Sequence, residues 1–407
     1  MLALLVLLIG CGVQKGANLS TGGWKTCPRC ANNLVNAHGK PIVMGDERFE
    51  QYLPLLEGKR VAILTNHTGL VGTKADSPHI LDVLLEKGVD VDLVFSPEHG
   101  FRGTADAGEM VDSGRDPKTG VTVVSLYGSG AKPDPAGFDV LLVDIQDVGT
   151  RFYTYYITML RMMDVCAAYG RPVIILDRPN PNGFTVDGPV LDPRFKSGVG
   201  ALPIPVMHGM TLGELARMIV GEGWLDNGRS CELTVIPCLN YTHATLYELP
   251  VAPSPNLKDM QAVYLYPSTC LFEGTTLSLG RGTPWPFEVY GHPSFPVTGF
   301  TFTPQSVPGA KNPPLKDLNC NGVDLRKVPR KRIRAAGVDL SYIIDAYKRM
   351  ATSGEPFWNG NFFELLIGVD YVRPMIQAGA SAEEIKVRWT GDLEKFLNLR
   401  SEYLIYD

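Results

Sequence analysis

Carboxylate, imidazole and guanidinium side chains follow several apolar runs in the first half of the chain. Glu98 comes just after Val91–Phe95, and Asp147 comes just after Val140–Ile145. A carboxylate at the end of a buried strand can have its pKa raised by desolvation, which suits a general acid. Glu98 is the first candidate for that role, because Pro97 before it restricts the approach of the backbone.

Other side chains near the ends of these runs could bind a polar ligand. Arg151 could grip a carboxylate bidentately, and the alternating Tyr153 and Tyr155 could line a sugar subsite. Glu273 and Arg281 stand among Gly and Thr residues, in a segment that could reach back over the same crevice. The candidate catalytic residues are Glu98, Asp147, Tyr153 and Glu273. The candidate substrate-binding residues are Asn66, His67, His99, Gln146, Arg151, Tyr155, Asp177, Arg178, Asn180, His208 and Arg281.

Each candidate also has a purely structural interpretation. Asp147 could pair with Arg151, and Asp177 and Arg178 could form an ion pair that stiffens a turn. His208 follows an apolar segment, where a histidine is more often a hydrogen-bonded part of the core than a ligand. The concentration of such groups at successive strand ends nevertheless favours a functional site.

These side chains can form one site only if the fold brings the strand ends together. The pattern of apolar residues predicts such a fold. The predicted strands are 60–65, 91–95, 122–126, 140–145 and 172–176, and the predicted helices are 79–87, 154–169 and 211–220. Continuous apolar strands that alternate with helices predict a doubly wound, mainly parallel α/β sheet. Ligands of such sheets bind outside the carboxyl ends of the strands, which is where the candidates lie.

The chain beyond about residue 250 has a different pattern, with Pro-rich and aromatic turns before its helices. The elements predicted there are helices at 340–350 and 382–397 and basic loops at 311–314 and 326–334. We therefore expect a catalytic α/β domain over residues 45–250 and a smaller α+β domain over residues 251–407. The smaller domain is expected to contribute loops to the active-site cleft.

Composition and missing motifs exclude several classes of function. Hydrophobic residues make up 44% of the 407 residues and charged residues 20%, which excludes a wholly disordered chain. A formal net charge of -5 is a poor fit to non-specific nucleic-acid binding, which needs a basic surface. The first predicted strand is not followed by G-x-G-x-x-G, and no Walker A, G-x-S-x-G or H-E-x-x-H motif occurs. We therefore expect no cofactor and no bound metal.

Residues 1–11 resemble an export signal. Leu2–Ile9 is an apolar run too short to span a bilayer. Leu8-Ile9-Gly10-Cys11 resembles a bacterial lipobox, although no Lys or Arg precedes the run. The resemblance implies lipidation at Cys11, so we expect an exported lipoprotein, periplasmic or at the cell surface, with this anchor as its only membrane contact. Residues 12–44 are expected to form a flexible tether.

Five ordered motifs resemble those of the NamZ family of exo-β-N-acetylmuramidases, from about residue 48 to the end of the chain. They are Ser96–Gly103 (SPEHGFRG), Asp144–Tyr155 (DIQDVGTRFYTY), Asp177–Pro181 (DRPNP), Val206–Thr211 (VMHGMT) and Glu273–Thr275 (EGT). The resemblance implies a Rossmann-like catalytic domain and a smaller C-terminal domain. It also implies release of N-acetylmuramic acid from the non-reducing ends of peptidoglycan fragments, with the family's proposed catalytic glutamate at Glu98.

That activity would divide the chemistry among the candidates. Glycoside cleavage usually needs an acid on the leaving oxygen, here Glu98, and a second group that handles the anomeric centre. The candidates for the second group are Asp147, Glu273, Tyr153 and the substrate's own acetamido group. Muramic acid carries a lactyl carboxylate, which calls for a cationic partner. The candidates for that partner are Arg151, Arg178 and Arg281.

Two other functions remain open. A metal-dependent hydrolase could use His67, His99, His208 and Asp177, because groups on separate strand ends can converge as a ligand set. A lipoprotein that binds muropeptides without catalysis would use the same crevice. In each case the expected partners are peptidoglycan-derived sugars, and nucleic acid is not among them.

Overall fold

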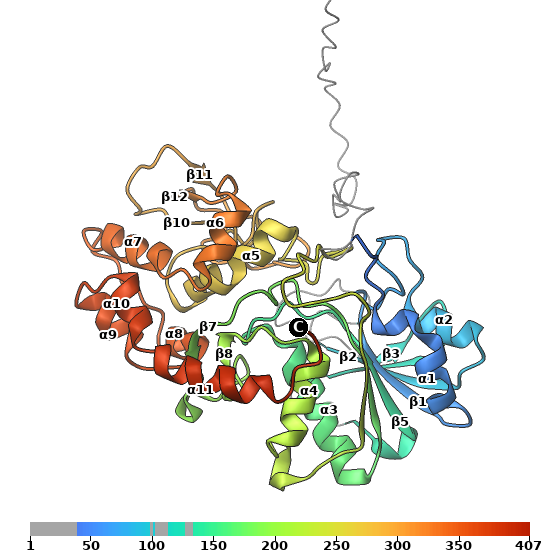
Figure 1. Ribbon diagram of the computed structural model, residues 1–407. Coiled ribbons are helices and arrows are strands. Elements are labelled where there is room, and N and C mark those ends of the chain that lie inside the picture. Colours follow the sequence, from blue (N-terminus) through green and yellow to red (C-terminus); the bar gives the residue numbers. More distant parts are fainter. Residues whose placement is uncertain (1–38, 98–100, 102–112, 127–132) are drawn as a thin grey trace, which may run out of the picture.

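The computed structural model describes residues 39–97, 101, 113–126 and 133–407. Within them, a seven-stranded sheet forms one part of the molecule and a more helical domain forms the other (Figure 1). The strand order is β3-β4-β2-β1-β5-β6-β9, and all neighbours are parallel except β3 and β4. The strands are β1 (Val61–Thr65), β2 (Val91–Ser96), β3 (Gly114–Arg115), β4 (Thr122–Ser125), β5 (Val140–Asp144), β6 (Val173–Leu176) and β9 (Leu233–Ile236).

Helices cover both faces of this sheet, as a doubly wound fold requires. Val61 and Ile63 of β1 belong to one apolar cluster with α1 and α2, whereas Ala62 and Leu64 belong to another with α3 and α4. Successive strand residues point to opposite faces, so continuous apolar strands fill two layers of core at once. The four helices are α1 (Phe49–Leu56), α2 (Ile80–Glu86), α3 (Tyr155–Tyr169) and α4 (Leu212–Gly221). The predicted α/β fold is confirmed.

Local signals place the ends of two of these helices. The side chain of Thr211 accepts a hydrogen bond from the backbone N–H of Glu214, and the Glu214 side chain bonds back to the N–H of Thr211. These reciprocal bonds form a capping box at the start of α4. Helix α3 ends where Gly170 takes a left-handed conformation with φ of 62°, which glycine adopts at little steric cost.

The direction of strand order reverses between β1 and β5. From β1 the chain proceeds outward to β2 and β4, and it then returns to β5 on the other side of β1. Thr65 at the end of β1 pairs in register with Asp144 at the end of β5. The segments that begin at Asn66 and Ile145 therefore leave the sheet side by side, at the position where open α/β sheets bind ligands.

The second domain combines helices with a small antiparallel sheet in the order β10-β12-β11. Its elements are α5 (Met260–Thr269), β10 (Val289–His292), β11 (Thr301–Phe302), β12 (Cys320–Asp324), α6 (Arg330–Ala336), α7 (Ser341–Met350), α8 (Phe362–Ile367), α9 (Val372–Gln377), α10 (Ala382–Val387) and α11 (Thr390–Ser401). A separate antiparallel pair, β7 (Asp187–Val190) and β8 (Pro205–Met207), lies between β6 and β9 in sequence. A smaller α+β companion to the sheet domain is thus present, and the boundary predicted after residue 250 falls between β9 and α5.

Two local predictions for this domain are wrong. Residues 330–336 form α6 and not a basic loop, because Ile333 is buried while the charged residues around it face solvent. The helix predicted over 382–397 is two helices, α10 and α11. The break lies at Trp389, whose buried indole donates a hydrogen bond to Asp187 Oδ1 at 3.2 Å and so ties the corner to β7.

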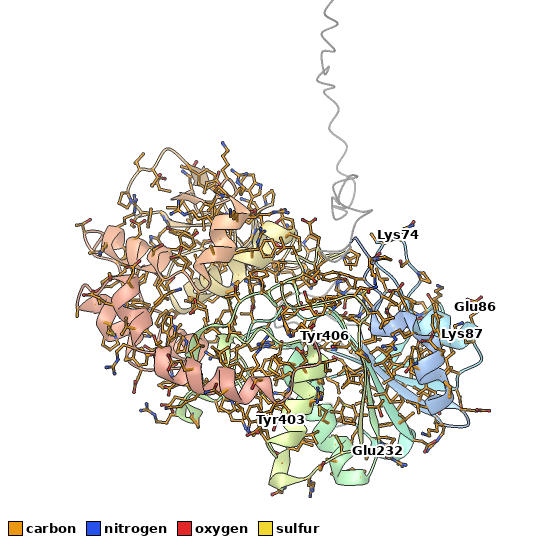
Figure 2. All side chains as sticks on the ribbon, viewed as in Figure 1. Lys74, Glu86, Lys87, Glu232, Tyr403 and Tyr406 are labelled. Carbon is orange, nitrogen blue, oxygen red and sulfur yellow. The ribbon has the colours of Figure 1, made fainter. Side chains whose placement is uncertain are left out.

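The C-terminal segment returns to the sheet domain. Tyr406 donates a hydrogen bond to Asp177 Oδ2 at 2.7 Å, and the backbone N–H of Ile405 donates to Glu214 Oε1 at 2.9 Å. Figure 2 shows Tyr406 above α4, where the chain leaves α11. The last described residues therefore complete hydrogen bonding at the end of β6 and the start of α4.

The flexible tether predicted over residues 12–44 extends too far. Val43 pairs with Leu239 through two backbone hydrogen bonds of 3.1 and 2.8 Å, and Met44 is fully buried. Ile42 and Met44 are apolar and pack into the main core, so this stretch belongs to the fold. Residues 1–38, including Cys11, lie outside the described residues. In the part of the chain that the structure describes, no helix is both long and apolar enough to cross a bilayer.

Candidate active site

Tyr153 and Tyr155 stand side by side at the carboxyl edge of the sheet, between β5 and the first turn of α3. Their rings meet edge to face with centroids 4.6 Å apart, and both hydroxyls donate to the carbonyl of Pro253, at 2.8 and 3.0 Å. Asn66, just after β1, donates through Nδ2 to the Tyr155 hydroxyl at 2.9 Å. His67 contacts the neighbouring carbonyl of Ala252 at 2.7 Å through Nε2. The two central strand ends and the segment before α5 are thereby joined.

A small hollow of about 100 Å³ opens against these tyrosines. We call it the tyrosine hollow, and its lining residues are Phe152, Tyr153, Thr154, Tyr155, Val199, Ser254, Asn256, Leu257, Tyr266, Glu273, Arg281 and Phe287. Four of them are residues predicted from the sequence: Tyr153, Tyr155, Glu273 and Arg281. The structure therefore brings candidates from both domains to one place, as expected of a smaller domain that contributes to the cleft.

Glu273 and Arg281 form an ion pair in the wall of this hollow. Arg281 donates to Glu273 Oε1 through Nε at 3.1 Å and through Nη2 at 2.6 Å, and its guanidinium lies 4.9 Å from the centre of the Phe287 ring. Burial lowers the pKa of Arg281, but the Glu273 carboxylate outweighs that effect, so the guanidinium stays charged. The flanking Gly280 and Gly282 have φ of 85° and 80°, which lets the loop turn tightly.

Asp147 and Gln146 lie nearby but line a different space. They belong to a cavity of about 10 Å³ beneath the ends of β5 and β6. Asp147 Oδ1 accepts a hydrogen bond from the N–H of Gly149 at 2.7 Å, and its Oδ2 has no partner among the described residues. Burial raises the pKa of Asp147 to about 7, so this carboxyl can hold a proton near neutrality. Gln146 is tied down by bonds from Nε2 to the carbonyls of Asp147 and Pro179.

Arg151 is not placed to grip a substrate. Its side chain is fully buried, and it donates to the carbonyls of Pro189, Ile204, Leu366 and Ile367 at 2.7 to 2.9 Å. It does not pair with Asp147 either. These bonds join the sheet domain to α8, so Arg151 is a structural link and we withdraw it as a carboxylate-binding candidate.

Arg178 is occupied in the same way. It bonds to Asp144 at 2.6 and 3.0 Å and to Asp46 at 2.7 Å, with all three side chains nearly or wholly excluded from solvent. The carboxylates hold the pKa of Arg178 above its usual range despite burial. Because the buried guanidinium already donates to two carboxylates, it is not placed to bind the carboxylate of a substrate. The prediction of Arg178 as a carboxylate-binding residue therefore has no support in this geometry.

Asp177, Asn180 and His208 are parts of the scaffold. Asp177 accepts bonds from Thr211, Gly213 and Tyr406, and burial raises its pKa to about 6. Asn180 donates to the carbonyl of Met210 and accepts from the N–H of Asn182. His208 is buried and accepts from the N–H of Met210 through Nδ1. Burial lowers its pKa to about 3, so the ring is neutral. Their predicted contact with substrate has no support in this geometry.

The ligand set of the metal-dependent alternative does not assemble. His67 bonds to a backbone carbonyl, Asp177 is taken by three donors, and His208 lies in the core. Nowhere in residues 39–97, 101, 113–126 and 133–407 do three His, Cys, Asp or Glu side chains gather as metal ligands. His99, the fourth proposed ligand, lies outside these ranges.

Glu98 lies outside the described residues as well, but its neighbours in sequence do not. Pro97 directly follows β2, which pairs with β1. Phe101 is buried and packs edge to face on His79, with ring centroids 5.1 Å apart, and His79 Nε2 contacts the carbonyl of Asn66 at 2.8 Å. The chain on both sides of Glu98 therefore borders the end of β1.

Two features of the site have no signal in the sequence. The carbonyl of Pro253 holds both tyrosine hydroxyls, and a backbone oxygen cannot be recognised from residue type. Phe287, just before β10, lies with its ring against the Arg281 guanidinium. In the sequence it cannot be told from an ordinary core aromatic residue. The Ser254-Pro255-Asn256 turn marks where this segment bends but not what it contacts.

Comparison with known families decides which proteins this chain is related to. Residues 61–261 match the N-terminal domain of the exo-beta-N-acetylmuramidase NamZ, and residues 264–406 match its C-terminal domain. The chain belongs to the NamZ family. The resemblance drawn from five motifs is thus confirmed, and this member of the NamZ family is a glycosidase.

Individual relatives agree with this assignment over nearly the whole chain. The peptidoglycan beta-N-acetylmuramidase NamZ of Bacillus subtilis (strain 168) is 38% identical over 382 residues, which cover 89% of this chain and 90% of that protein. Two crystal structures of DUF1343 family proteins from Bacteroides fragilis NCTC 9343 share the fold. Their TM-scores are 0.83 at 55% identity and 0.74 at 27% identity, and each match covers 90% of this chain and 99% of the other.

Proposed function

We propose that this NamZ-family glycosidase releases N-acetylmuramic acid from the non-reducing ends of peptidoglycan fragments. One observation carries the proposal: a tyrosine pair from the sheet domain and the Glu273–Arg281 ion pair from the second domain wall the same hollow. Muramic acid combines apolar ring faces with a lactyl carboxylate, and the hollow offers aromatic surface beside a guanidinium. The Bacillus subtilis relative, named as a peptidoglycan beta-N-acetylmuramidase, supports this class of substrate.

Arg281 is our proposed partner of the lactyl carboxylate. Of the three arginines considered, Arg151 and Arg178 are buried and occupied, whereas Arg281 lines the hollow with about a fifth of its side chain exposed. At about 100 Å³ the tyrosine hollow is smaller than sites that enclose whole small molecules, at roughly 300 Å³ or more. It therefore suits one substituent of the sugar, and we assign the lactyl group to it.

Glu98 is our proposed general acid. Glycoside cleavage needs a proton on the leaving oxygen, and a glutamate that follows a central strand is suited to supply it. The described residues around it support this role, since Pro97 and Phe101 both border the end of β1, next to Asn66 and Tyr155.

For the second catalytic group, which acts at the anomeric carbon, we favour the acetamido group of the substrate over the protein side chains. Glu273 is held by Arg281, Asp147 lines a separate cavity, and the Tyr153 hydroxyl is bonded to Pro253. An acetamido oxygen can attack its own anomeric carbon when no enzyme carboxylate is placed to do so. Replacing the acetyl group by mono-, di- and trifluoroacetyl should lower kcat stepwise; rates independent of fluorination would return the role to a protein side chain.

One assay separates the proposed function from its alternatives. The purified protein is incubated with a defined MurNAc-GlcNAc disaccharide, with and without EDTA, and free MurNAc is measured. The proposal predicts equal release in both samples. Release abolished by EDTA would favour the metal-dependent hydrolase, and saturable binding without any product would favour a binding lipoprotein.

We also propose export and anchoring through Cys11, which lies outside the described residues. Support comes from the apolar run and lipobox-like segment before it. The proposed substrate is a cell-wall fragment, which an exported enzyme would meet directly.

A further inference from the structure

A second, larger hollow adjoins the tyrosine hollow within the second domain. We call it the outer cleft; it is lined by residues from three segments, 272–281, 309–315 and 359–362, and its volume is about 890 Å³. Glu273 and Arg281 line both spaces, so the two meet at this ion pair. A volume of this size lies within the roughly 300–1,000 Å³ range of small-molecule sites, which is enough for more than one sugar ring.

The walls of the outer cleft carry apolar and neutral polar surface beside the charged side chains of Glu273, Arg281 and Lys311. Leu277 and the half-buried Phe362 supply apolar surface, and Asn312 and Asn359 are exposed amides whose side chains have no hydrogen bond within the described protein. An amide both donates and accepts, so it can pair with the hydroxyl and acetamido groups of a sugar. Asn359 is held in place by its backbone N–H, which donates to the carbonyl of Gly274 at 2.9 Å beside the ion pair. The wall is thus positioned before any ligand arrives.

We propose that the outer cleft binds the sugars on the leaving side of the scissile bond, beginning with N-acetylglucosamine and continuing along the glycan. The inference rests on the proposed function, in which the terminal muramic acid places its lactyl group in the tyrosine hollow against Arg281. An exo-acting enzyme must stop the chain at its non-reducing end, and the small hollow is where it stops. The rest of the glycan then extends into the space that shares a wall with that hollow.

A stem peptide is the other possible occupant, and the ion pair disfavours it. A peptide is joined to muramic acid through the lactyl carboxyl, so its amide removes the negative charge that Arg281 is proposed to bind. A free lactyl carboxylate would bind the Arg281 guanidinium, whereas a lactyl group that carries a peptide offers it no negative charge. A peptide-bearing substrate therefore distinguishes the two occupants.

The experiment compares kcat/KM for three substrates: an aryl N-acetylmuraminide, the tetrasaccharide (MurNAc-GlcNAc)₂, and a tetrasaccharide with a stem peptide on its terminal MurNAc. We expect wild type to prefer the peptide-free tetrasaccharide over the aryl substrate. In the double variant N312A/N359A, the ratio of these two kcat/KM values should fall about five- to tenfold, as expected from the loss of two neutral hydrogen bonds. The matched control N398A removes an exposed amide on α11, away from the cleft, and should keep the wild-type ratio.

Three results would overturn the inference. One is a wild-type ratio that N312A/N359A leaves unchanged, because neither substrate is affected. Another is an equal loss on both substrates, which also keeps the ratio and would mean that the amides do not contact the leaving-side sugars. The third is a loss confined to the peptide-bearing substrate, which would assign the cleft to the stem peptide. Failure of the proposed function itself looks different, because wild type would then release no MurNAc from any of the three.

Discussion

Both hydrogen bonds of the Arg281–Glu273 pair end on one carboxylate oxygen, Oε1 of Glu273. The guanidinium uses Nε and Nη2 for this contact, and its Nη1 has no hydrogen bond to any described residue. The pair thus fixes the orientation of the arginine against Phe287 and leaves a donor for a ligand. Such a preset cation loses little conformational freedom when it binds an anion.

Removing this guanidinium should weaken binding of the lactyl carboxylate specifically. We expect R281M to raise KM for an aryl N-acetylmuraminide about ten- to hundredfold, the size of one lost charge-assisted hydrogen bond. The lactyl methyl ester of the same substrate should be hydrolysed equally by R281M and wild type. The control R332M removes an exposed arginine of α6. Equal losses on acid and ester would show that Arg281 does not read the carboxylate.

Replacing the proposed acid should matter most when the leaving group is poor. We expect E98Q to lower kcat on the MurNAc-GlcNAc disaccharide by about 10²–10⁴-fold. The loss should be much smaller for a dinitrophenyl muraminide, whose leaving group departs without protonation. E57Q, an exposed glutamate at the end of α1, serves as the matched control. A folded E98Q enzyme with near-wild-type turnover of the disaccharide would remove Glu98 from the mechanism.

The buried carboxyl of Asp147 should make stability depend on pH. Burial raises its pKa from 3.8 to about 7, so between these values the native state keeps a proton that the unfolded state has lost. The free energy of unfolding of wild type should therefore fall as pH rises from about 4 to about 7, by at most ~1.4 kcal/mol per pH unit. D147N has no titrating group there, so its stability relative to wild type should rise over that window and level off above pH 7.

Denaturant unfolding at pH 4 to 8 measures this difference. D76N, at an exposed position, controls for the loss of a negative charge and should track wild type at every pH. A constant difference between D147N and wild type would mean that Asp147 is ionised in the native state throughout.

Arg151 should matter for stability and not for substrate binding. R151M removes the guanidinium donor from four buried carbonyls, of which that of Ile204 keeps a bond from the N–H of Leu191. We therefore expect the free energy of unfolding to fall by about 3 kcal/mol or more. At a temperature where the variant is still folded, its KM should stay within about twofold of wild type. R161M, on the exposed side of α3, is the control. Unchanged stability with a raised KM would restore Arg151 as a binding residue.

Anchoring through Cys11 makes a prediction in cells. The precursor of the wild-type protein should accumulate as a larger species when globomycin blocks lipoprotein signal cleavage, and the protein should fractionate with membranes in its absence. C11S should show neither the processed form nor membrane fractionation. A wild-type protein of constant size that stays in the aqueous fraction would rule out the anchor.

The scaffold could be predicted from the sequence because its signals are local. Apolar runs such as Val61–Thr65, and the capping box at Thr211 and Glu214, depend only on nearby residues. Glu273 and Arg281 could likewise be proposed from a local feature, a charged side chain among Gly and Thr residues. Short elements escaped notice, such as β3 and β11 at two residues each, since two residues show no period.

The roles of individual candidates could not be predicted in the same way. Arg151 and Arg281 look alike in sequence, each a cation among Gly, Thr and aromatic residues. Arg151 differs only because carbonyls up to 216 residues away surround it. Whether an arginine is free to bind a ligand thus depends on long-range packing, which residue type and spacing do not encode.

The bond from Tyr406 to Asp177 joins residues 229 positions apart. During synthesis, the end of β6 emerges long before the residue that completes its hydrogen bonding. Thr211 and Gly213 of the first domain already donate to this carboxylate, so the last-made segment adds the third bond. Loss of the last two residues would therefore remove a buried hydrogen bond of the sheet domain, although the truncation lies at the end of the second domain.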